Sequence, residues 1–557
     1  MKYSNSLLKG YEDMRLVGYA DAELPNTVCY DELPERYMTG VLKMNRHKDG
    51  KLIQTYSATE SHVGVIAATR LGKTTSYVIP TIVSFARQKV KRSMIISDPK
   101  GELYRSTSQT LREQGYDVKL LNFRDYVHSE CWNMLTPIFR KYQTANNIAT
   151  QVTSFVENGE YKYKFFGKIY TDENELERDV VLCSDMLLDE VGNDIDMLCS
   201  MFITTEKLQD PYWEDSAREL LKAFLWAMLE DSDESAANRI TEETFSFSTI
   251  LTILAQFRDD NGTHYNDSGY FSSRKASSRA LQLAKNNLLE NASNTRKCVV
   301  ATFNTKMAVF RECAMRLITR CNSFDVEGIC DKPTAVFINY RDEVKVHYQV
   351  ISLFVQNAYK YLIERANASG NGKLDVPFYF ILDEFGNFPA IRDFETTISA
   401  CAGRNIFFIL IFQSYAQLNR VYGADVAEII RDNLNMHVFF GSNNPATLRA
   451  FSEECGEYTR ISPLSALNGN GDGMEQFSIE TIPLVTKSRL SHFAAGECII
   501  TEANSGYVMF SKLERYYECS EFIGLPEAAE TDYMCEVNPF DKKYVYEIKL
   551  RRNSPFD

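Results

Sequence analysis

Residues 62–88 read HVGVIAATRLGKTTSYVIPTIVSFARQ, and this stretch decides the fold. It begins with a short apolar run, VGVIA, which predicts a buried strand. A turn rich in Gly, Lys and Thr follows, and apolar residues then recur at helical spacing as far as Gln88. Next come a strand at SMIIS, a helix containing Tyr104 and Leu111, and a strand at VKLLNF (118–123). Such alternation of strands and helices is typical of a parallel sheet covered by helices.

The turn at residues 67–74, AATRLGKT, fits the phosphate-loop template G-x-x-x-x-G-K-[ST], except that Ala67 stands at the first glycine position. A strand before the loop and a helix after it are the context that this motif needs. We expect Lys73 to bridge the terminal phosphates of a nucleotide and the Thr74 hydroxyl to hold Mg²⁺, with loop N–H groups facing the phosphates. The predicted nucleotide contacts are Ala68, Thr69, Arg70, Leu71, Gly72, Lys73, Thr74 and Thr75. The alternative is a chance GKT in a strand–helix turn.

Two adjacent carboxylates close a second apolar run. Asp383 and Glu384 follow PFYFIL, a pattern typical of a Walker-B element. There the Asp binds Mg²⁺, directly or through water, and the Glu activates the attacking water. The alternative is an acidic pair that caps a helix. Asp383 lies 310 positions after Lys73, so the two motifs fit one nucleotide site only if a domain is inserted between them.

Two further polar residues flank the strand IFFILIF, which follows the acidic pair. Gln413 comes directly after it, where an amide senses the γ-phosphate or orients water, or else merely begins a helix. Arg404 precedes it, at the end of AIRDFETTISACAGR. Its guanidinium complements the dipole of its own helix, contacts the γ-phosphate within its own subunit, or serves as an arginine finger for the nucleotide of a neighbouring subunit. The turn at residues 98–102, DPKGE, reads as a brace or as a turn that faces DNA or another subunit.

The composition is that of a globular protein with an acidic surface. Lys and Arg total 61 and Asp and Glu total 75, which gives a formal charge of −14. This balance argues against a surface coated with basic residues, but not against a small basic channel. No apolar run approaches the roughly 20 residues of a spanning helix. The thirteen scattered cysteines form no C-x-x-C pair, which favours buried, reduced thiols in a cytoplasmic protein.

The chain divides into an α/β core split by helical material. Helical periodicity dominates after Pro211, and strand patterns return at TAVFIN (334–339). Residues 161–170, YKYKFFGKIY, follow Asn158-Gly159 and predict a hairpin, whose lysines and aromatic residues either contact nucleic acid or form a solvated face over a packed one. The expected divisions are a polar segment at 1–60, a nucleotide-binding domain at 61–210 with extra material near 150–195, an all-α domain at 211–332, the second part of the nucleotide-binding domain at 333–525, and a tail at 526–557.

Six segments, in this order, resemble the TraG-type coupling proteins of type IV secretion and conjugation, a branch of the FtsK/HerA-like ATPases. The segments are TRLGKTTSYVIPT, SDPKGELY, DPYWEDSARELL, LDEFGNFP, CAGRNIFFILIFQSYAQLNRVYG and PLVTKSRLSHFAAGECII. The resemblance spans roughly residues 60–520. It implies an α/β fold, namely a RecA-like P-loop domain with a mostly parallel sheet interrupted by an all-α domain, and six such chains in a ring.

The resemblance also implies ATP and Mg²⁺ as cofactors and the transfer of DNA with its bound relaxase toward a membrane channel. By position, Lys73 and Thr74 match the phosphate and Mg²⁺ residues of the family, and Asp383 and Glu384 match its Mg²⁺ and water-activating residues. Gln413 matches the glutamine at a strand tip, and Arg404 falls where such proteins place a candidate finger.

The chain departs from the family pattern in two ways. Ala67 replaces the first glycine, and the N-terminal membrane anchor that relatives usually carry is not evident. We therefore expect a cytoplasmic protein held at the inner face of the membrane by a membrane-anchored secretion subunit. Three hypotheses follow: a DNA pump, an ATPase of the same fold that exports protein without touching DNA, and a non-catalytic adaptor. The intact Lys73, Asp383 and Glu384 argue against the adaptor.

Overall fold

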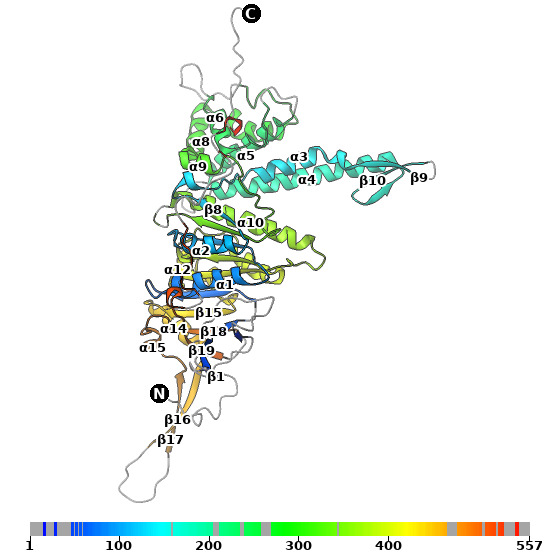
Figure 1. The fold of residues 1–557 in the computed structure, drawn as a ribbon. Helices are drawn as coiled ribbons and strands as arrows, with labels where there is room; N and C mark the ends of the chain where they lie inside the picture. Colours follow the sequence, from blue (N-terminus) through cyan, green and yellow to red (C-terminus); the bar gives the residue numbers. More distant parts are fainter. Residues whose placement is uncertain are drawn as a thin grey trace, which may run out of the picture. The chain divides into compact units, whose positions relative to one another are not determined.

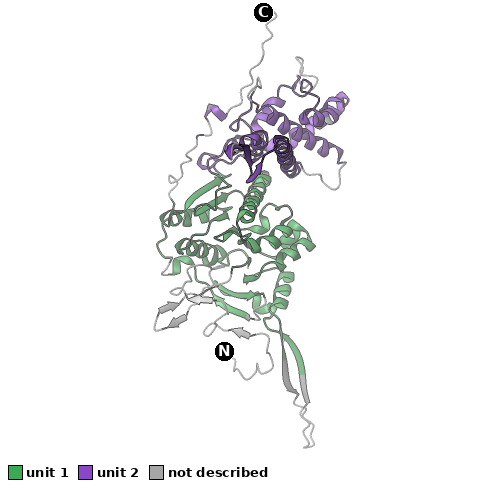
Figure 2. Ribbon diagram, turned by 90° about the vertical axis from the view of Figure 1, so that its right-hand side faces the viewer, with its two compact units in different colours: residues 1–124, 325–533 green, residues 125–324, 534–557 purple. Residues whose placement is uncertain are grey.

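The computed structural model describes residues 60–528 apart from 158–159, 204–210, 234–238, 258–268, 342, 344, 465–475, 504–506 and 520–521. Short pieces at 15–17, 27–29, 46–48, 51–53, 55–57, 538 and 541–544 are described as well. The chain forms two compact units, coloured in Figure 2. Unit 1 comprises residues 1–124 and 325–533, and unit 2 comprises residues 125–324 and 534–557.

A ten-stranded sheet forms the centre of unit 1 (Figure 1). From one edge to the other its strands are β1 (Arg15–Val17), β19 (Tyr507–Lys512), β18 (Glu497–Glu502), β15 (Met436–Gly441), β6 (Val63–Ala67), β14 (Ile406–Phe412), β13 (Phe378–Leu382), β7 (Met94–Ser97), β12 (Thr334–Asn339) and β8 (Asp117–Asn122). The run from β15 to β8 is parallel throughout, and β18 pairs antiparallel with β15. The predicted α/β class with a mostly parallel sheet is thus confirmed.

The central strands are apolar along their whole length because both faces of the sheet are covered. Every residue of β6, β13 and β14 is buried. Phe380 of β13 stacks on Phe408 of β14 with ring centroids 4.7 Å apart. The helices of unit 1 are α1 (Ile79–Arg87), α2 (Glu102–Glu113), α10 (Tyr348–Ala368), α11 (Phe394–Cys401), α12 (Tyr415–Tyr422), α13 (Ala424–Asp432), α14 (Pro445–Glu454) and α15 (Lys487–Leu490).

Smaller strand pairs complete unit 1. They are β2 (Thr27–Cys29) with β5 (Thr55–Ser57), β3 (Arg46–Lys48) with β4 (Lys51–Ile53), and β16 (Glu457–Leu464) with β17 (Gln476–Pro483). The segment before residue 60, expected only as a polar stretch, therefore contributes strands, and β1 pairs parallel with β19 at the edge of the main sheet. Strands of three residues are too short for periodicity to reveal them.

Unit 2 is mostly helical. Its helices are α3 (Thr136–Asn146), α4 (Glu173–Phe202), α5 (Tyr212–Glu230), α6 (Phe247–Leu254), α7 (Arg279–Ala284), α8 (Ser293–Lys306) and α9 (Cys313–Ile318). The apolar periodicity after Pro211 becomes α5, which buries Leu220, Phe224 and Met228 completely. In the described part of the chain, no helix has the length and apolar character needed to cross a membrane.

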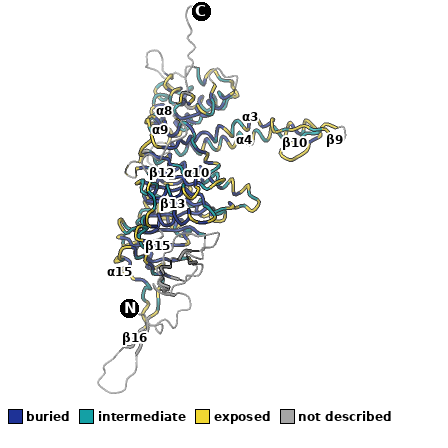
Figure 3. The backbone as a smooth tube through the Cα atoms, in the orientation of Figure 1, coloured by how far each residue is buried: buried dark blue, intermediate teal, exposed yellow. Residues whose placement is uncertain are grey.

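A three-stranded sheet packs at one end of the α3–α4 pair (Figures 1 and 3). It consists of β9 (Thr153–Glu157), β10 (Glu160–Phe165) and β11 (Lys168–Tyr170), all antiparallel. The hairpin expected around Asn158-Gly159 is present as β9 and β10, although these two turn residues lie outside the described ones. Phe165 and Tyr170 are buried against Ile148 and Leu176, so these aromatic residues belong to a small hydrophobic core.

The division into units differs from the boundaries expected from sequence. Contacts assign everything between residues 125 and 324 to unit 2, whereas the sequence pattern placed the change near residue 210. The reason is packing: α3 lies along α4, and α4 also contacts α5, so the stretch expected as extra material joins the helical unit. Unit 2 is consequently not all-α, because it includes β9, β10 and β11.

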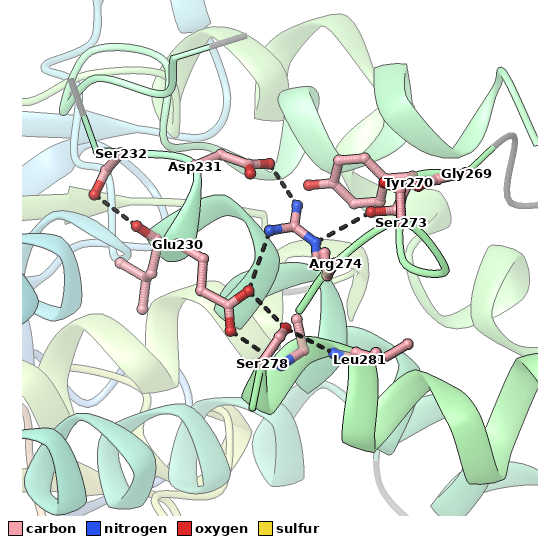
Figure 4. A network of polar contacts seen from close by, with 11 residues as sticks. Glu230, Asp231, Ser232, Gly269, Tyr270, Ser273, Arg274, Ser278 and Leu281 are labelled. Atoms are coloured by element: carbon pink, nitrogen blue, oxygen red, sulfur yellow. Dashed lines mark hydrogen bonds and ion pairs between the residues drawn. The ribbon is translucent and has the colours of Figure 1, made fainter. Parts of the chain in front are cut away.

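Partly buried ion pairs join α5 to the segment before α7 within unit 2 (Figure 4). The Arg274 guanidinium lies 3.1 Å from a carboxylate oxygen of Glu230 and 2.6 Å from one of Asp231. The hydroxyl of Ser278 donates to Glu230 at 2.7 Å and also accepts from the backbone N–H of Leu281, at the start of α7. Burial raises the pKa of Asp231 despite the neighbouring guanidinium, so the network depends on the positive charge of Arg274.

We predict that Arg274→Ala weakens this part of unit 2. The change leaves two partly buried carboxylates without their counter-charge, which should lower the local free energy of unfolding by about 1–3 kcal/mol. Hydrogen exchange measured by mass spectrometry on the full chain should then be faster in peptides from α5 and α7. The matched control is Arg178→Ala, whose side chain is 75% exposed and which should shift stability by less than about 0.5 kcal/mol. Equal exchange in both variants would contradict the role given to the network.

Candidate nucleotide site

The phosphate loop connects β6 to the helical segment that begins at Thr74. Ala67 is the last residue of β6 and is fully buried, so its methyl group packs in the sheet and not in the loop. Arg70 has φ +68° and Gly72 has φ +90°. Both lie in the left-handed region, which costs a glycine nothing. The loop is tied down at its start, where the Ala68 N–H donates to the Gly441 carbonyl of β15 at 2.8 Å.

The loop offers unused donors to an anion. Within the described part of the chain, the backbone N–H groups of Thr69, Arg70 and Gly72 donate to no acceptor of the protein. Thr69 and Arg70 are exposed, whereas Thr74 and Thr75 are half-buried. Successive free N–H groups before a helix N-terminus form a concave site for phosphate oxygens. The loop therefore fits the phosphates of a nucleotide.

Lys73 is nearly buried and lies between the two carboxylates that follow β13. Its Nζ is 2.5 Å from Oε1 of Glu384 and 3.2 Å from Oδ1 of Asp383. The structure thus brings together residues 310 positions apart. Glu384 begins a short 3₁₀ turn (Phe385–Asn387) with φ +54°, but its side chain makes no capping hydrogen bond. The interpretation of the acidic pair as a helix cap is therefore wrong.

Charge attraction outweighs burial at this cluster. Burial alone would lower the pKa of Lys73, but the Asp383 and Glu384 carboxylates raise it above its usual value. Burial alone would raise the pKa of Glu384, but Lys73 and the amide of Gln413 hold it below its usual value. Lys73 is therefore charged and Glu384 ionised around neutral pH.

Gln413 reaches the same cluster from the next strand. It follows β14, and its Nε2 donates to Oε2 of Glu384 at 3.3 Å. Its backbone N–H donates to Oε1 of Gln417 in α12, at 2.8 Å. These two contacts hold Gln413 beside the Glu384 carboxylate.

Two residues of the DPKGE turn also lie at this edge of the sheet, although the sequence pattern indicated a brace or a turn that faces DNA or another subunit. Lys100 Nζ lies 3.8 Å from Oε1 of Glu384, with its side chain 56% exposed. Asp98 is buried at the end of β7, where desolvation raises its pKa to about 7 despite the N–H that Tyr104 donates to it. Their position in the sequence could have identified these two residues, because the turn directly follows a strand that is parallel to the strand before Asp383.

Arg404 lies where the parallel strands begin, whereas the phosphate loop and the acidic pair lie where they end. It precedes β14, while Gln413 follows it, and the seven residues of that strand span about 23 Å. Its Nη1 donates to the Ala400 carbonyl of the preceding helix at 2.9 Å. Arg404 is thus far from the Lys73 of its own chain, and a role as a finger requires a second chain.

Two of the three hairpin lysines, Lys162 and Lys168, are held by acidic neighbours. Lys162 pairs with Glu157 at 2.8 Å, and Lys168 pairs with both Glu175 and Asp179 at 3.0 Å. Because these ammonium groups already have counter-charges, the hairpin favours the solvated-face interpretation over a contact with nucleic acid.

The residues fit Mg²⁺ only together with a nucleotide. In the described part of the chain, no group of three or more His, Cys, Asp or Glu side chains is arranged to hold a metal ion. Thr74 and Asp383 supply one hydroxyl and one carboxylate on the two sides of Lys73. Mg²⁺ is commonly held by one or two such protein oxygens together with phosphate oxygens and water.

Comparison with known proteins supports the resemblance seen in the sequence. Protein VirD4 of Rhizobium rhizogenes is 22% identical over 408 residues, which cover 72% of this chain and 50% of that protein. The chain therefore matches about half the length of this curated relative. The structure of the bacterial conjugative coupling protein TrwBdeltaN70 in its unbound form aligns with a TM-score of 0.53 at 13% identity, covering 81% of this chain and 85% of that one.

The family comparison covers most of the chain. The model that describes conjugative DNA transfer by the type IV secretory system matches residues 27–531. That span includes the phosphate loop, the acidic strand end, Gln413 and residues 125–324 of the helical unit. The chain is therefore a member of the type IV secretory system conjugative DNA transfer family.

Proposed function

We propose that this protein is an ATP-driven coupling protein that recruits a relaxase–DNA complex to a type IV secretion channel and energises its transfer. The observation that carries the proposal is the convergence of Lys73, Asp383, Glu384 and Gln413 at one edge of the sheet. Phosphate, metal and water-activating groups are the set that ATP hydrolysis needs. Membership of the DNA transfer family supports DNA as the cargo.

The roles follow from the contacts. When nucleotide phosphates enter the loop, Lys73 turns from the carboxylates to the phosphate oxygens, with which it forms charge-assisted hydrogen bonds. Glu384 then loses the neighbour that most lowers its pKa, so its affinity for a proton rises. Glu384 accepts the proton of the attacking water, which the Gln413 amide orients. Mg²⁺ would be held by Thr74 and Asp383 and would neutralise charge on the phosphates.

This exchange of partners makes the basicity of Glu384 depend on whether a nucleotide is bound. Without nucleotide, Lys73 neutralises Glu384 and the carboxylate is a weak base. With nucleotide, the same lysine neutralises phosphate and the carboxylate becomes available. In the nucleotide-free state the ion pair therefore spares the buried Lys73 an unpaired charge, which would cost several kcal/mol.

The assembly and partners belong to the same proposal. We place six copies in a ring, with DNA of any sequence in the central channel and relaxosome proteins bound to the ring. A membrane-anchored secretion subunit holds the ring at the inner face of the membrane. Export of protein without direct DNA contact is the competing function, and the DNA-binding experiment below separates the two.

We predict Mg²⁺-dependent ATP hydrolysis that requires Lys73 and Glu384. Lys73→Ala should abolish nucleotide binding, because the charge-assisted phosphate contacts are lost. Glu384→Gln should still bind ATP but hydrolyse it at least about a hundredfold more slowly, since the general base is gone. Binding is measured with a fluorescent nucleotide analogue and turnover by phosphate release. Glu453→Gln, an exposed change of the same kind on α14, should leave both unchanged. Native turnover in Glu384→Gln would refute the assignment.

We predict that DNA binding is independent of sequence and weakens steeply with salt. Phosphate contacts release counter-ions, so the logarithm of the binding constant should fall linearly with the logarithm of salt concentration. The test is fluorescence anisotropy with single- and double-stranded oligonucleotides of two unrelated sequences, with an ATP analogue present. Absence of binding to either form at about 50 mM salt would favour the protein-export function.

We predict that Arg404 acts on the nucleotide of a neighbouring subunit. A guanidinium at that boundary would neutralise charge on the transferred phosphoryl group, with an effect of about 10³ or more on rate. Arg404→Ala alone should therefore be inactive, whereas the exposed Arg392→Ala should be active. Mixing Lys73→Ala subunits with Arg404→Ala subunits should restore some hydrolysis, because some interfaces then pair an intact Lys73 with an intact Arg404. No recovery in rings shown to be mixed would exclude action across the interface.

A further inference from the structure

A pocket of about 560 Å³ opens within unit 2, between α6 and the segment that contains α9. Three arginines line one side, Arg311, Arg316 and Arg320. The facing side is formed by α6 and the residues that follow it, with Ser248, Thr252 and Gln256. These three recur every four residues, so they lie on one face of the helix and its continuation. The volume falls in the range of about 300–1,000 Å³ that is usual for ligand pockets.

The charge of this pocket is unusual for the protein. No acidic residue lines it, although the whole chain has a formal charge of −14. Among the described residues, neither Arg311 nor Arg316 lies within ion-pair distance of a carboxylate, and one amino group of Arg311 donates to the Asn304 side chain. Several other arginines of unit 2 are paired, among them Arg140 with Glu242 at 2.8 Å and Arg218 with Asp215 at 2.9 Å.

Arg311 and Arg316, which have no ion pair among the described residues, indicate that this pocket takes an anionic ligand. Like charges that converge repel one another, and a bound anion removes that repulsion. A guanidinium presents up to five N–H donors in a planar fork, which matches the oxygens of a phosphate group. The pocket also has apolar walls, Leu251 and Ala255 of α6 and the ring of Tyr544, whose face is covered by the ammonium group of Lys543 at 4.8 Å from the centroid.

We propose that this pocket binds the phosphodiester backbone of a nucleic acid, with Arg311 and Arg316 holding phosphate oxygens. This inference rests on the proposed DNA transfer function and assigns a DNA contact to the helical unit. Cationic side chains beside apolar and aromatic walls are the usual composition of a groove for single-stranded nucleic acid. The contact is not specific for sequence, because no base edge is read by the arginines.

The test compares the full chain with the double variant Arg311→Ala/Arg316→Ala, using fluorescence anisotropy on a single-stranded oligonucleotide. Loss of two phosphate contacts should reduce the slope of log K against log salt by about 1.4 and raise the Kd at least about tenfold at low salt. The double variant Arg140→Ala/Arg178→Ala removes the same charge from other faces of unit 2 and should change the Kd by less than about twofold. Arg311→Lys/Arg316→Lys keeps the charge, so it should retain the slope but lose affinity.

The outcomes separate the inference from the function on which it rests. If the wild-type chain binds the oligonucleotide and the alanine and lysine variants bind it with the same Kd and slope, the pocket assignment is overturned and DNA transfer stands. If the wild-type chain binds no nucleic acid, both fall. Loss of binding to anionic phospholipid vesicles with unchanged oligonucleotide binding would overturn the assignment in favour of a lipid headgroup.

Discussion

The buried contact of Lys73 with Asp383 and Glu384 is the interaction on which the site depends. One positive charge lies between two nearly buried negative ones. Removing Lys73 would leave both carboxylates without a counter-charge away from water, which is costly. The contact also joins the beginning and the end of the α/β unit, because Lys73 follows β6 and the carboxylates follow β13. Electrostatics, and not loop chemistry alone, therefore assembles the two halves of the site.

Strand order explains how this contact is possible. Strands β6, β14, β13, β7 and β12 are neighbours in the sheet, and all are parallel. Parallel strands bring their carboxyl ends to one edge, where ligands of open α/β sheets bind. Lys73, Gln413, Asp383 and Asp98 each follow one of the first four of these strands. Arg404, which precedes its strand, is excluded from that edge by the same geometry.

Unit 2 is organised differently from the sheet of unit 1. Its main part, residues 125–324, is inserted between β8 and β12, which pair directly in the sheet, so the insertion leaves the sheet intact. Its carboxylates are mostly matched by lysines and arginines, as in the network around Arg274 and the hairpin around Lys168. Against this background the pocket containing Arg311 and Arg316 stands apart, since these two arginines lie within ion-pair distance of no carboxylate among the described residues. An insertion of this kind is free to acquire cargo contacts without disturbing the nucleotide site.

The sequence by itself determined the α/β class, the phosphate loop, the acidic strand end and the hairpin, because each depends on local periodicity or on adjacent residues. It also determined that a domain interrupts the sheet, since the motifs stand 310 positions apart. It did not determine where that domain begins, the strands before residue 60, or the contact of Lys100 with Glu384. Those features arise from long-range packing: a helix joins whichever unit buries its apolar face, and a three-residue strand exists only because a partner pairs with it. The tertiary structure also decided that Arg404 lies away from the nucleotide site of its own chain. The reason is the direction of β14 in the sheet, which places the end after Arg404 far from the phosphate loop and the end before Gln413 next to it.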